Sequence, residues 1–186
     1  EEINYVIDVA SKIDCPAVIM RAGMFFYAER VFREKTYQRL IDTLREIINR
    51  IESLGMDMYI ENYPYPFDIV VLPSDFARLY RSLKSRVYLA LNLPHLYDVY
   101  RNRKVDVFSE LQMNLPWIRI VYISEYINPW DYPHRLDTRR FNAYVDFLKK
   151  TTNILKRGEL GAIVVIGYSK EDVLSAKELV MRRLFG

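Results

Sequence analysis

Cysteine is almost missing from the chain, since Cys15 is the single one among 186 residues. One cysteine cannot form an internal disulfide, which excludes a disulfide-stapled scaffold and favours a reducing compartment. Long hydrophobic runs are also lacking, and none approaches the roughly 20 residues that a membrane-spanning helix needs. No signal-peptide pattern opens the sequence. We therefore expect a cytoplasmic protein with no membrane partner.

An excess of one charge is lacking as well. The formal net charge is only +3, which is too small to indicate nucleic-acid binding by itself. The six glycines form no phosphate-cradling loop. Hydrophobic residues make up 51% of the chain, and at this length they can supply the core of one domain. We expect a single globular domain over residues 1–186.

What the chain does contain is an alternation of short apolar runs with longer amphipathic segments. The runs predict strands at 17–20, 56–60, 86–92, 118–123 and 161–167. Helical spacing predicts helices at 3–13, 40–54, 74–83, 105–114 and 138–156, and a last helix after residue 169. Strands this apolar, each followed by a helix, favour a parallel α/β sheet with right-handed crossovers. An open five-stranded sheet and part of an eight-stranded barrel both fit.

Polar residues stand where several of these strands end. Arg21 ends the first strand, Glu61 and Asn62 follow the second, and Glu125 follows the fourth. The third strand ends at Asn92, and Pro94 is interpreted as the residue that stops it. A basic loop at 101–104 then precedes the next predicted helix. Parallel α/β folds keep their chemistry at strand carboxyl ends. This edge is therefore the predicted site.

Three motifs in this order resemble those of the second half of the xylose isomerase-like TIM barrels. They are Ile60-Glu61-Asn62, then Asn92-Leu93-Pro94-His95, then a strand followed by a loop with Asp131 and His134. That superfamily includes sugar isomerases and epimerases and the endonuclease IV type of abasic-site (AP) nucleases. The resemblance implies a partial (β/α)8 barrel made of strands four to eight, with three βα units missing ahead of Glu1.

The resemblance also implies a divalent-metal site, because the family binds zinc, manganese or magnesium at these strand ends. Glu61 stands at the family's glutamate and His95 at the histidine of its Asp-x-x-His motif, while Asp131 and His134 approximate its Asp-x-His. Other positions depart from the pattern. Where the family has two histidines, this chain has Arg21 and Tyr122, and where the family has an aspartate it has Asn92. Gly167 stands approximately at the position of the family's last glutamate.

These departures predict a degenerate metal site. Arg21 adds a permanent cation, so we expect it to pair with Glu61 and Glu125 where the metal would lie. The cofactor is then none, or a weakly bound zinc, manganese or magnesium ion held by Glu61 and His95. The remaining assignments follow the resemblance: the predicted catalytic residues are Glu61, His95 and His134, and the predicted binding residues are Arg21, Asn62, Asn92, Tyr122, Glu125 and Asp131.

Three functions stay open at this point. The first is a ligand-binding or weakly active relative of the sugar isomerases and epimerases, with a small sugar or sugar phosphate as ligand. The second is a metal-dependent sugar isomerase or epimerase, or an endonuclease IV-like nuclease. The aromatic loop at 63–67 beside the basic residues at 101–104 would then stack on nucleic acid, although aromatic residues next to prolines in a loop more often form a lid or pack. The third is an interaction module, whose open sheet edge a second copy or a missing amino-terminal segment covers.

Overall fold

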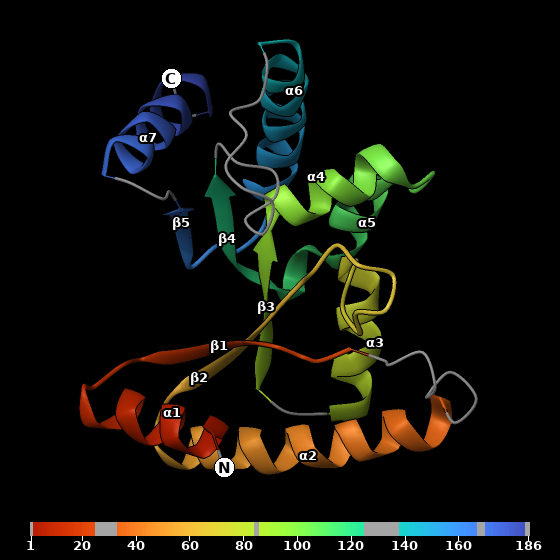
Figure 1. Ribbon diagram of the computed structural model, residues 1–186, viewed down its shortest axis with the longest axis vertical. Coiled ribbons are helices and arrows are strands. Elements are labelled where there is room, and N and C mark those ends of the chain that lie inside the picture. Colours follow the sequence, from red (N-terminus) through yellow and green to blue (C-terminus); the bar gives the residue numbers. More distant parts are fainter. Residues whose placement is uncertain (1, 25–32, 84–85, 125–137, 167–169, 185–186) are drawn as a thin grey trace.

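Five parallel strands in sequential order form the framework of this computed structural model (Figure 1). The structure describes residues 2–24, 33–83, 86–124, 138–166 and 170–184, and Glu125, Asp131, His134 and Gly167 lie outside these ranges. The strands are β1 (Ala17–Arg21), β2 (Asp57–Glu61), β3 (Val87–Asn92), β4 (Ile118–Ser124) and β5 (Ala162–Ile166). They curl into a half-barrel, which confirms the predicted partial (β/α)8 barrel.

Helices separate the strands and form one continuous row of contacts on the outside of the sheet. They are α1 (Glu2–Lys12), α2 (Arg33–Ser53), α3 (Pro73–Leu83), α4 (Leu93–Asn102), α5 (Val107–Asn114), the 3-10 turn η2 (Leu115–Trp117), α6 (Thr138–Leu155) and α7 (Lys170–Leu184). One face of α2 is buried, formed by Ile41, Leu44, Ile47, Ile48 and Ile51, and Gly55 follows the helix with a φ of +75°, a conformation that favours glycine. No helix in the described ranges is long and apolar enough to span a bilayer.

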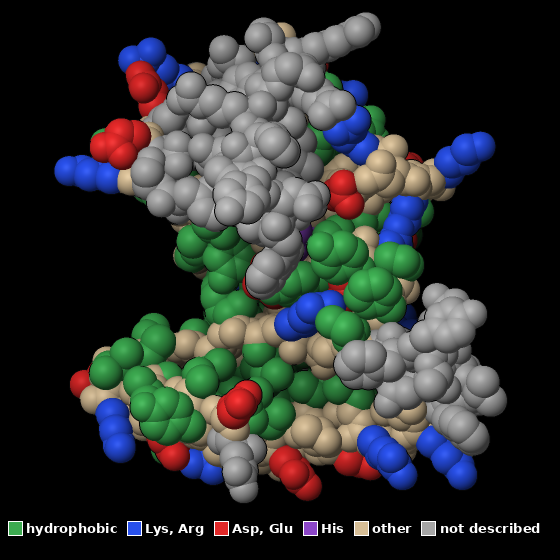
Figure 2. All heavy atoms as spheres, viewed as in Figure 1, with side chains coloured by type: hydrophobic (Ala, Val, Ile, Leu, Met, Phe, Trp, Pro, Cys, Tyr) green, Lys and Arg blue, Asp and Glu red, His purple; other side chains and the backbone are tan. Residues whose placement is uncertain are grey.

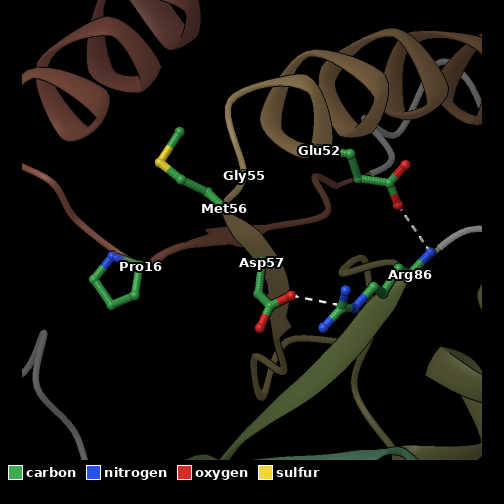
Figure 3. Close-up of a pocket in the computed structure, with 6 residues that line it drawn as sticks. All are labelled: Pro16, Glu52, Gly55, Met56, Asp57 and Arg86. Atoms are coloured by element: carbon green, nitrogen blue, oxygen red, sulfur yellow. Dashed lines mark hydrogen bonds and ion pairs between the residues drawn. The ribbon is translucent and has the colours of Figure 1, made fainter.

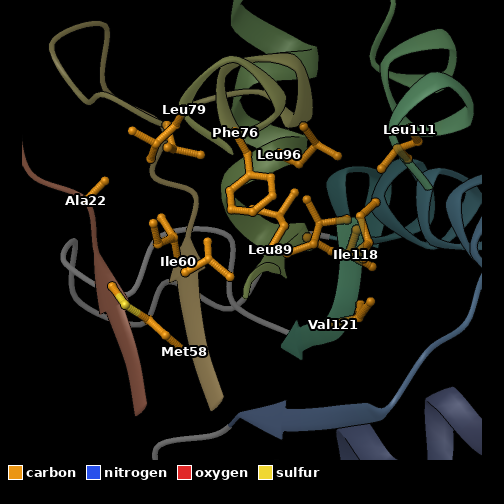
Figure 4. Close-up of a cluster of buried hydrophobic side chains, with 14 of the residues drawn as sticks. Ala22, Met58, Ile60, Phe76, Leu79, Leu89, Leu96, Leu111, Ile118 and Val121 are labelled. Carbon is orange, nitrogen blue, oxygen red and sulfur yellow. The ribbon is translucent and has the colours of Figure 1, made fainter. Parts of the chain in front are cut away.

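The core lies between the sheet and this row of helices (Figure 4). Because side chains alternate along a strand, every second residue of β2 and β3 faces outward, toward the helices. Met58, Ile60 and Leu89 do so and are fully buried against residues such as Phe76 and Leu96. Burying each such side chain stabilises the fold by about 1.5–3 kcal/mol. The alternate residues are left on the concave inner face of the half-barrel.

Helix α4 corrects the interpretation of the segment after β3. The proline at residue 94 was taken to stop a strand before a loop, whereas the chain turns directly into a helix at Leu93. A proline lies without penalty in the first turn of a helix, because the N–H it lacks has no helical partner there. The predicted basic loop is correspondingly shorter, since Arg101 and Asn102 belong to the last turn of α4.

The pairing of β3 with β4 contains one irregularity. Leu89 pairs with Ile118, but the next residue, Ala90, pairs with Ile120, so β4 carries one extra residue, Arg119. The Arg119 guanidinium lies over the ring of Tyr88, 5.2 Å from its centroid. Beyond the shift, Asn92 pairs with Tyr122, which places the two side chains on the same face of the sheet.

Candidate functional site

The sheet register brings the predicted strand-end residues together on the inner face of the half-barrel. Arg21 pairs with Glu61, Glu61 with Ala90, and Asn92 with Tyr122. Residues paired in parallel strands, and those two apart on one strand, point to the same side. Arg21, Glu61, Asn92 and Tyr122 therefore share one face at the carboxyl ends of four adjacent strands. We call this group, with the loop residues that contact it, the carboxyl-end site.

Two asparagines join β2 to β3 at this site. The backbone N–H of Asn92 donates to the Asn62 side-chain oxygen across 2.6 Å, and the Asn62 amide donates to the Asn92 carbonyl across 3.3 Å. Both residues are buried, and Asn62 has no exposed surface. Asn62 thus satisfies a backbone donor and a backbone acceptor just past the end of the β2 ladder. Its role in the structure is to hold the two strand ends together.

The Asn92 side chain connects the strand end to two of the three predicted catalytic residues, Glu61 and His95. Its Nδ2 donates to Glu61 Oε1 across 2.8 Å, and its Oδ1 accepts from the backbone N–H of His95 at 3.1 Å. The second bond makes Asn92 the N-cap of α4. An aspartate could make the cap but not the donation to Glu61. The asparagine therefore occupies one acceptor site on the Glu61 carboxylate.

His95 is buried and held in one tautomer. Its Nδ1 lies 2.9 Å from the Asn62 carbonyl oxygen, which only accepts, so Nδ1 carries the proton. The other ring nitrogen, Nε2, is buried and has no hydrogen-bond partner among the described residues. Burial, and secondarily the Arg21 cation, lower the pKa of His95, while the bond to Asn62 opposes the shift. The imidazole is therefore neutral at pH 7, with a free lone pair on Nε2.

Glu61 approaches His95 without bonding to it. Glu61 Oε1 lies 3.9 Å from His95 Nδ1, beyond hydrogen-bond range. The Glu61 side chain is 18% exposed, so a ligand can reach it. Burial raises the pKa of Glu61, and the bond from Asn92 only partly offsets this. A carboxylate with a raised pKa is a better proton acceptor than an ordinary glutamate, which suits an acid/base role.

The Arg21 cation pairs with Asp68 and not with Glu61, which corrects the predicted charge cluster. Arg21 Nη2 donates to Asp68 Oδ1, and Asp68 Oδ2 accepts from the backbone N–H of Tyr65 at 3.1 Å. The guanidinium also lies over the Tyr63 ring at 4.5 Å, and that ring lies 4.8 Å from the His95 ring. Arg21, Tyr63 and His95 thus form a stack. Glu125, the other predicted partner, lies outside the described residues.

Sequence reasoning missed Asp68, although one signal was present. It is the single charged residue between Asn62 and Pro73, and its side chain is only 1% exposed. A lone carboxylate that a loop buries requires a cation. Burial raises the pKa of Asp68, and the hydrogen bond and charge of Arg21 only partly offset this increase. The Asp68 carboxylate is therefore largely removed from solvent. The pair attaches the loop after β2 to the end of β1.

Tyr122 completes the inner face beside Glu61. Burial raises the pKa of Tyr122 to about 12, and the charge of Glu61 and the Tyr63 phenol add to the shift. The phenol therefore stays protonated at neutral pH and can donate a hydrogen bond.

The described residues do not fit a closed divalent-metal site. In the ranges that the structure describes, no three histidine, cysteine, aspartate or glutamate side chains converge as metal ligands. Glu61 and His95 are two such donors, but Asn92 donates to Glu61 and Arg21 lies on the same face. The predicted residues Asp131 and His134 lie outside the described ranges.

The residues of the aromatic loop after β2 contact one another and Arg103, the residue that follows α4. The rings of Tyr65 and Phe67 stack on each other with centroids 5.4 Å apart, and the Arg103 guanidinium donates to the Pro64 carbonyl across 2.9 Å. Phe67 is still 38% exposed, so nucleic acid could stack on this pair without separating the two rings. Such stacking stays a prediction.

A pocket lies at the amino-terminal end of the strands, opposite the carboxyl-end site (Figure 3). This pocket, of about 590 Å³, has two carboxylates in its lining, and both are engaged by Arg86. Glu52 accepts from the Arg86 backbone N–H at 3.1 Å, and Asp57 lies 3.4 Å from Arg86 Nε. Amino-terminal ends of barrel strands serve stability, while carboxyl-terminal ends serve chemistry. The carboxyl-end site is therefore the candidate functional site.

Comparisons with known proteins agree with this geometry. Residues 1–173 match the family described as xylose isomerase-like TIM barrel. A D-tagatose 3-epimerase-like protein superposes with a TM-score of 0.70 at 17% identity, over 97% of this chain and 66% of that chain. A D-psicose 3-epimerase structure determined in the presence of D-fructose gives a TM-score of 0.69 at 13% identity, over 97% and 68%.

A third solved structure is the D-allulose 3-epimerase from Methylomonas sp. in complex with D-allulose. It gives a TM-score of 0.68 at 10% identity, over 97% of this chain and 67% of that one. The chain thus spans 66% of the length of the D-tagatose 3-epimerase-like protein. No sequence among the curated proteins matches it. At these identities the likeness to the solved structures concerns the fold alone.

Proposed function

Because the chain belongs to the xylose isomerase-like TIM barrel family, we propose that it is a sugar-binding relative of the isomerases and epimerases whose divalent-metal site has been lost. The observation that carries this proposal is the 2.8 Å hydrogen bond from the Asn92 amide to Glu61. A divalent ion on Glu61 would compete with this donor at Oε1. It would also meet the Arg21 guanidinium on the same face of the sheet.

The chemistry of the carboxyl-end site suits a polyhydroxylated ligand. Glu61 accepts hydrogen bonds and is partly exposed, while the Tyr122 hydroxyl, kept protonated by its raised pKa, donates them. The Nε2 of His95 has no hydrogen-bond partner among the described residues, and a ligand hydroxyl would reach it only if the side chains that bury it moved aside. Sugar hydroxyls both donate and accept, so they match this mixture. The structural neighbours include an epimerase with D-allulose bound, which makes ketohexoses the first ligands to test.

Calorimetric titration with D-allulose and D-fructose tests the proposal. We expect binding to be unchanged by EDTA, and Glu61→Gln to weaken it about tenfold, since a hydrogen bond to a charged group contributes about 1.5–3 kcal/mol. Glu159→Gln is the matched control, because the Glu159 side chain is 86% exposed and lies just before β5, at the opposite end of the strands from the site. It should leave affinity unchanged. Binding that appears only with stoichiometric Mn²⁺ or Zn²⁺ would contradict the loss of the metal site.

A second candidate function is slow proton transfer on the same ligand, favoured by the raised pKa of Glu61. The Glu61 carboxylate would take a proton from the carbon beside the sugar carbonyl. The C–H electron pair would form an enediolate, whose oxygen accepts a hydrogen bond from Tyr122, and Glu61 would return the proton to carbon. Exchange of that C–H with D₂O, followed by NMR on D-fructose, is the measurement. Exchange at the uncatalysed rate would rule this function out. The nuclease alternative stays a prediction.

A further inference from the structure

His95 carries a buried acceptor that the described structure leaves unused. Its side chain is 3% exposed, and Nε2 has no hydrogen-bond partner among the described residues. The ring is nevertheless fixed, because Nδ1 bonds to the Asn62 carbonyl and the His95 backbone N–H bonds to the Asn92 side chain. A buried polar atom without a partner costs free energy and requires an explanation. The Nε2 lone pair is therefore an acceptor that is held in position and covered.

Tyr63 is a described residue whose ring contacts the His95 ring. The two ring centroids lie 4.8 Å apart, and the ring planes are inclined by 39°. The Arg21 guanidinium lies over the same tyrosine ring, 4.5 Å from its centroid. Tyr63 directly follows the buried Asn62 at the end of β2 and is itself half-buried. The Tyr63 ring thus covers part of the imidazole, and the Arg21 cation stabilises the ring in that place.

The Arg21 cation is in turn held by the loop that begins at Tyr63. Arg21 Nη2 donates to Asp68 Oδ1, and the Asp68 side chain is 1% exposed. Asp68 Oδ2 accepts from the Tyr65 backbone N–H, and the Asp68 backbone N–H bonds to the Tyr65 carbonyl, both across 3.1 Å. Asp68 therefore closes the turn at 65–68 and fixes the cation at the same time. A movement of this turn would carry the carboxylate away from Arg21.

The loop at 63–70 is closed on itself and has few bonds to the rest of the described chain. Its two ends are joined by the bond from the Tyr63 backbone N–H to the Val70 carbonyl, across 3.0 Å. Figure 2 shows hydrophobic side chains gathered over this loop on an open face of the molecule. A compact surface loop with few external bonds opens at a lower cost than the core. Its hydrogen bonds to other described segments are Arg21 to Asp68, Arg103 to the Pro64 carbonyl, and the Ile69 N–H to the Gly23 carbonyl.

We propose that Tyr63 is a gate over the Nε2 of His95 and that the Arg21–Asp68 pair is its latch. When the pair separates, the guanidinium leaves the Tyr63 ring, and the ring turns aside so that a hydrogen-bond donor reaches Nε2. Tyr63 is thus a positioning residue of the carboxyl-end site, which sequence reasoning did not assign. Only the identity of the donor, a sugar hydroxyl, rests on the proposed function. The gate itself does not depend on it.

Carbethoxylation by diethyl pyrocarbonate tests the gate, because this reagent reacts with the free lone pair of a neutral imidazole. The Nε2 lone pair forms a bond to a carbonyl carbon of the reagent, ethyl carbonate leaves, and Nδ1 releases its proton to water. Mass spectrometry of the peptide that contains His95 follows the reaction at this residue alone. In the natural protein we expect His95 to react more slowly than free N-acetylhistidine.

Tyr63→Ala should react at least about fivefold faster than the natural protein, because it removes the aromatic and the cation–π contact beside the imidazole. Tyr65→Ala is the matched control, since the Tyr65 ring stacks on Phe67 in the same loop. Its rate should stay within about twofold of the natural one. Equal acceleration by the two variants, or a natural protein that reacts as fast as N-acetylhistidine, would overturn the proposal.

Asp68→Asn tests the latch while leaving the gate in place, so it decides the matter even where Tyr63→Ala fails to fold. It should accelerate the reaction by about threefold or more, because the guanidinium loses the carboxylate that holds it over the ring. Ile48→Ala, a variant of a fully buried residue on α2, controls for the loss of stability alone. Acceleration of the same size by Ile48→Ala would assign the effect to global unfolding and overturn the proposal.

D-allulose separates the gate from the proposed sugar site. Where both exist, a saturating concentration of the sugar should protect His95 from the reagent. Where no ketohexose binds, protection is absent and the proposed function fails, but the difference between Tyr63→Ala and Tyr65→Ala persists and supports the gate. Loss of that difference, with or without the sugar, overturns the gate.

Discussion

The amide of Asn92 donates a hydrogen bond to the Glu61 carboxylate across 2.8 Å, and the same side chain caps helix α4 through the His95 backbone N–H. Asn92 thus donates a hydrogen bond to the glutamate of the site and also starts the helix that carries the histidine of the site. A metal-binding aspartate at this position would keep the cap and lose the donation. The consequences of that single difference can be measured.

Replacing Asn92 with aspartate should destabilise the protein by about 2 kcal/mol at pH 7, because it removes a donor and places a second carboxylate beside Glu61. Repulsion raises the folded-state pKa of the pair. The folded state then holds a proton that the unfolded state has released, so stability falls as the pH rises above about 4.5. Urea unfolding at pH 5 and pH 7 measures this, and the penalty should be smaller at pH 5.

The same Asn92→Asp variant tests the proposed loss of the metal site. Added Mn²⁺ should raise the Tm of the variant more than that of the natural protein, since two adjacent carboxylates form a better cation site than a carboxylate and an amide. Asn92→Ala is the control, because it loses the cap and the donation without adding a charge. An equal response of all three proteins to Mn²⁺ would count against the proposal.

Asn62→Ala should cost about 3 kcal/mol of unfolding free energy. It leaves the N–H and the carbonyl of Asn92 buried without their partner, and each unsatisfied group costs about 1–3 kcal/mol. Asn102→Ala removes an asparagine that bonds to Asp98 at an exposed position, and it should change stability by less than about 0.5 kcal/mol. Chemical denaturation of both variants makes the comparison. Similar losses would mean that the asparagine link between β2 and β3 does not stabilise the fold.

Asp68→Asn should cost about 2 kcal/mol, because it leaves the Arg21 cation without its carboxylate. Removing one partner of a fully buried pair costs about 3–5 kcal/mol, and the smaller figure allows for the 27% exposure of Arg21. Asp57→Asn breaks the pair with Arg86, which is 70% exposed, and should cost less than about 1 kcal/mol. Thermal unfolding in low and high salt separates the two, since only the exposed pair is screened.

Acidification should destabilise the protein through His95. Its pKa is lowered in the folded state, so below pH 6.5 the unfolded chain binds a proton that the folded chain refuses. Stability is therefore lost as the pH falls from 6.5 through the lowered pKa. His95→Gln should have lower stability at pH 7 but a flatter dependence between pH 7 and pH 5. A variant with the same slope as the natural protein would assign the pH dependence to other groups.

Strand order and strand ends were predictable from the sequence. Apolar runs followed by amphipathic helices have few alternatives to a parallel sheet, and strand carboxyl ends meet at one edge by geometry. Glu61 and Asn92 were therefore found on one face as expected. Tyr122 lies within its strand and was assigned only by the resemblance to the family, and the register places it on the same face.

Two features were not predictable by the same means. The start of α4 was missed because a proline after a strand indicates a stop as readily as a first helical turn, and the Asn92 cap that decides between them is a side-chain contact. The Arg21–Asp68 pair was missed because it joins residues 47 positions apart through an irregular loop. Periodicity says nothing about the path of such a loop.

The extra residue in β4 determines which way Tyr122 points. Side chains alternate along a strand, so regular pairing that kept Arg119 in the ladder would place Arg119 opposite Ala90 and Val121 opposite Asn92. Tyr122 would then point at the helices, and the neighbouring Val121 would point at Glu61 and Asn92. An aliphatic side chain would thus replace a hydroxyl in the site without any substitution having occurred there. The bulge at Arg119 is therefore part of what presents the hydroxyl to the site.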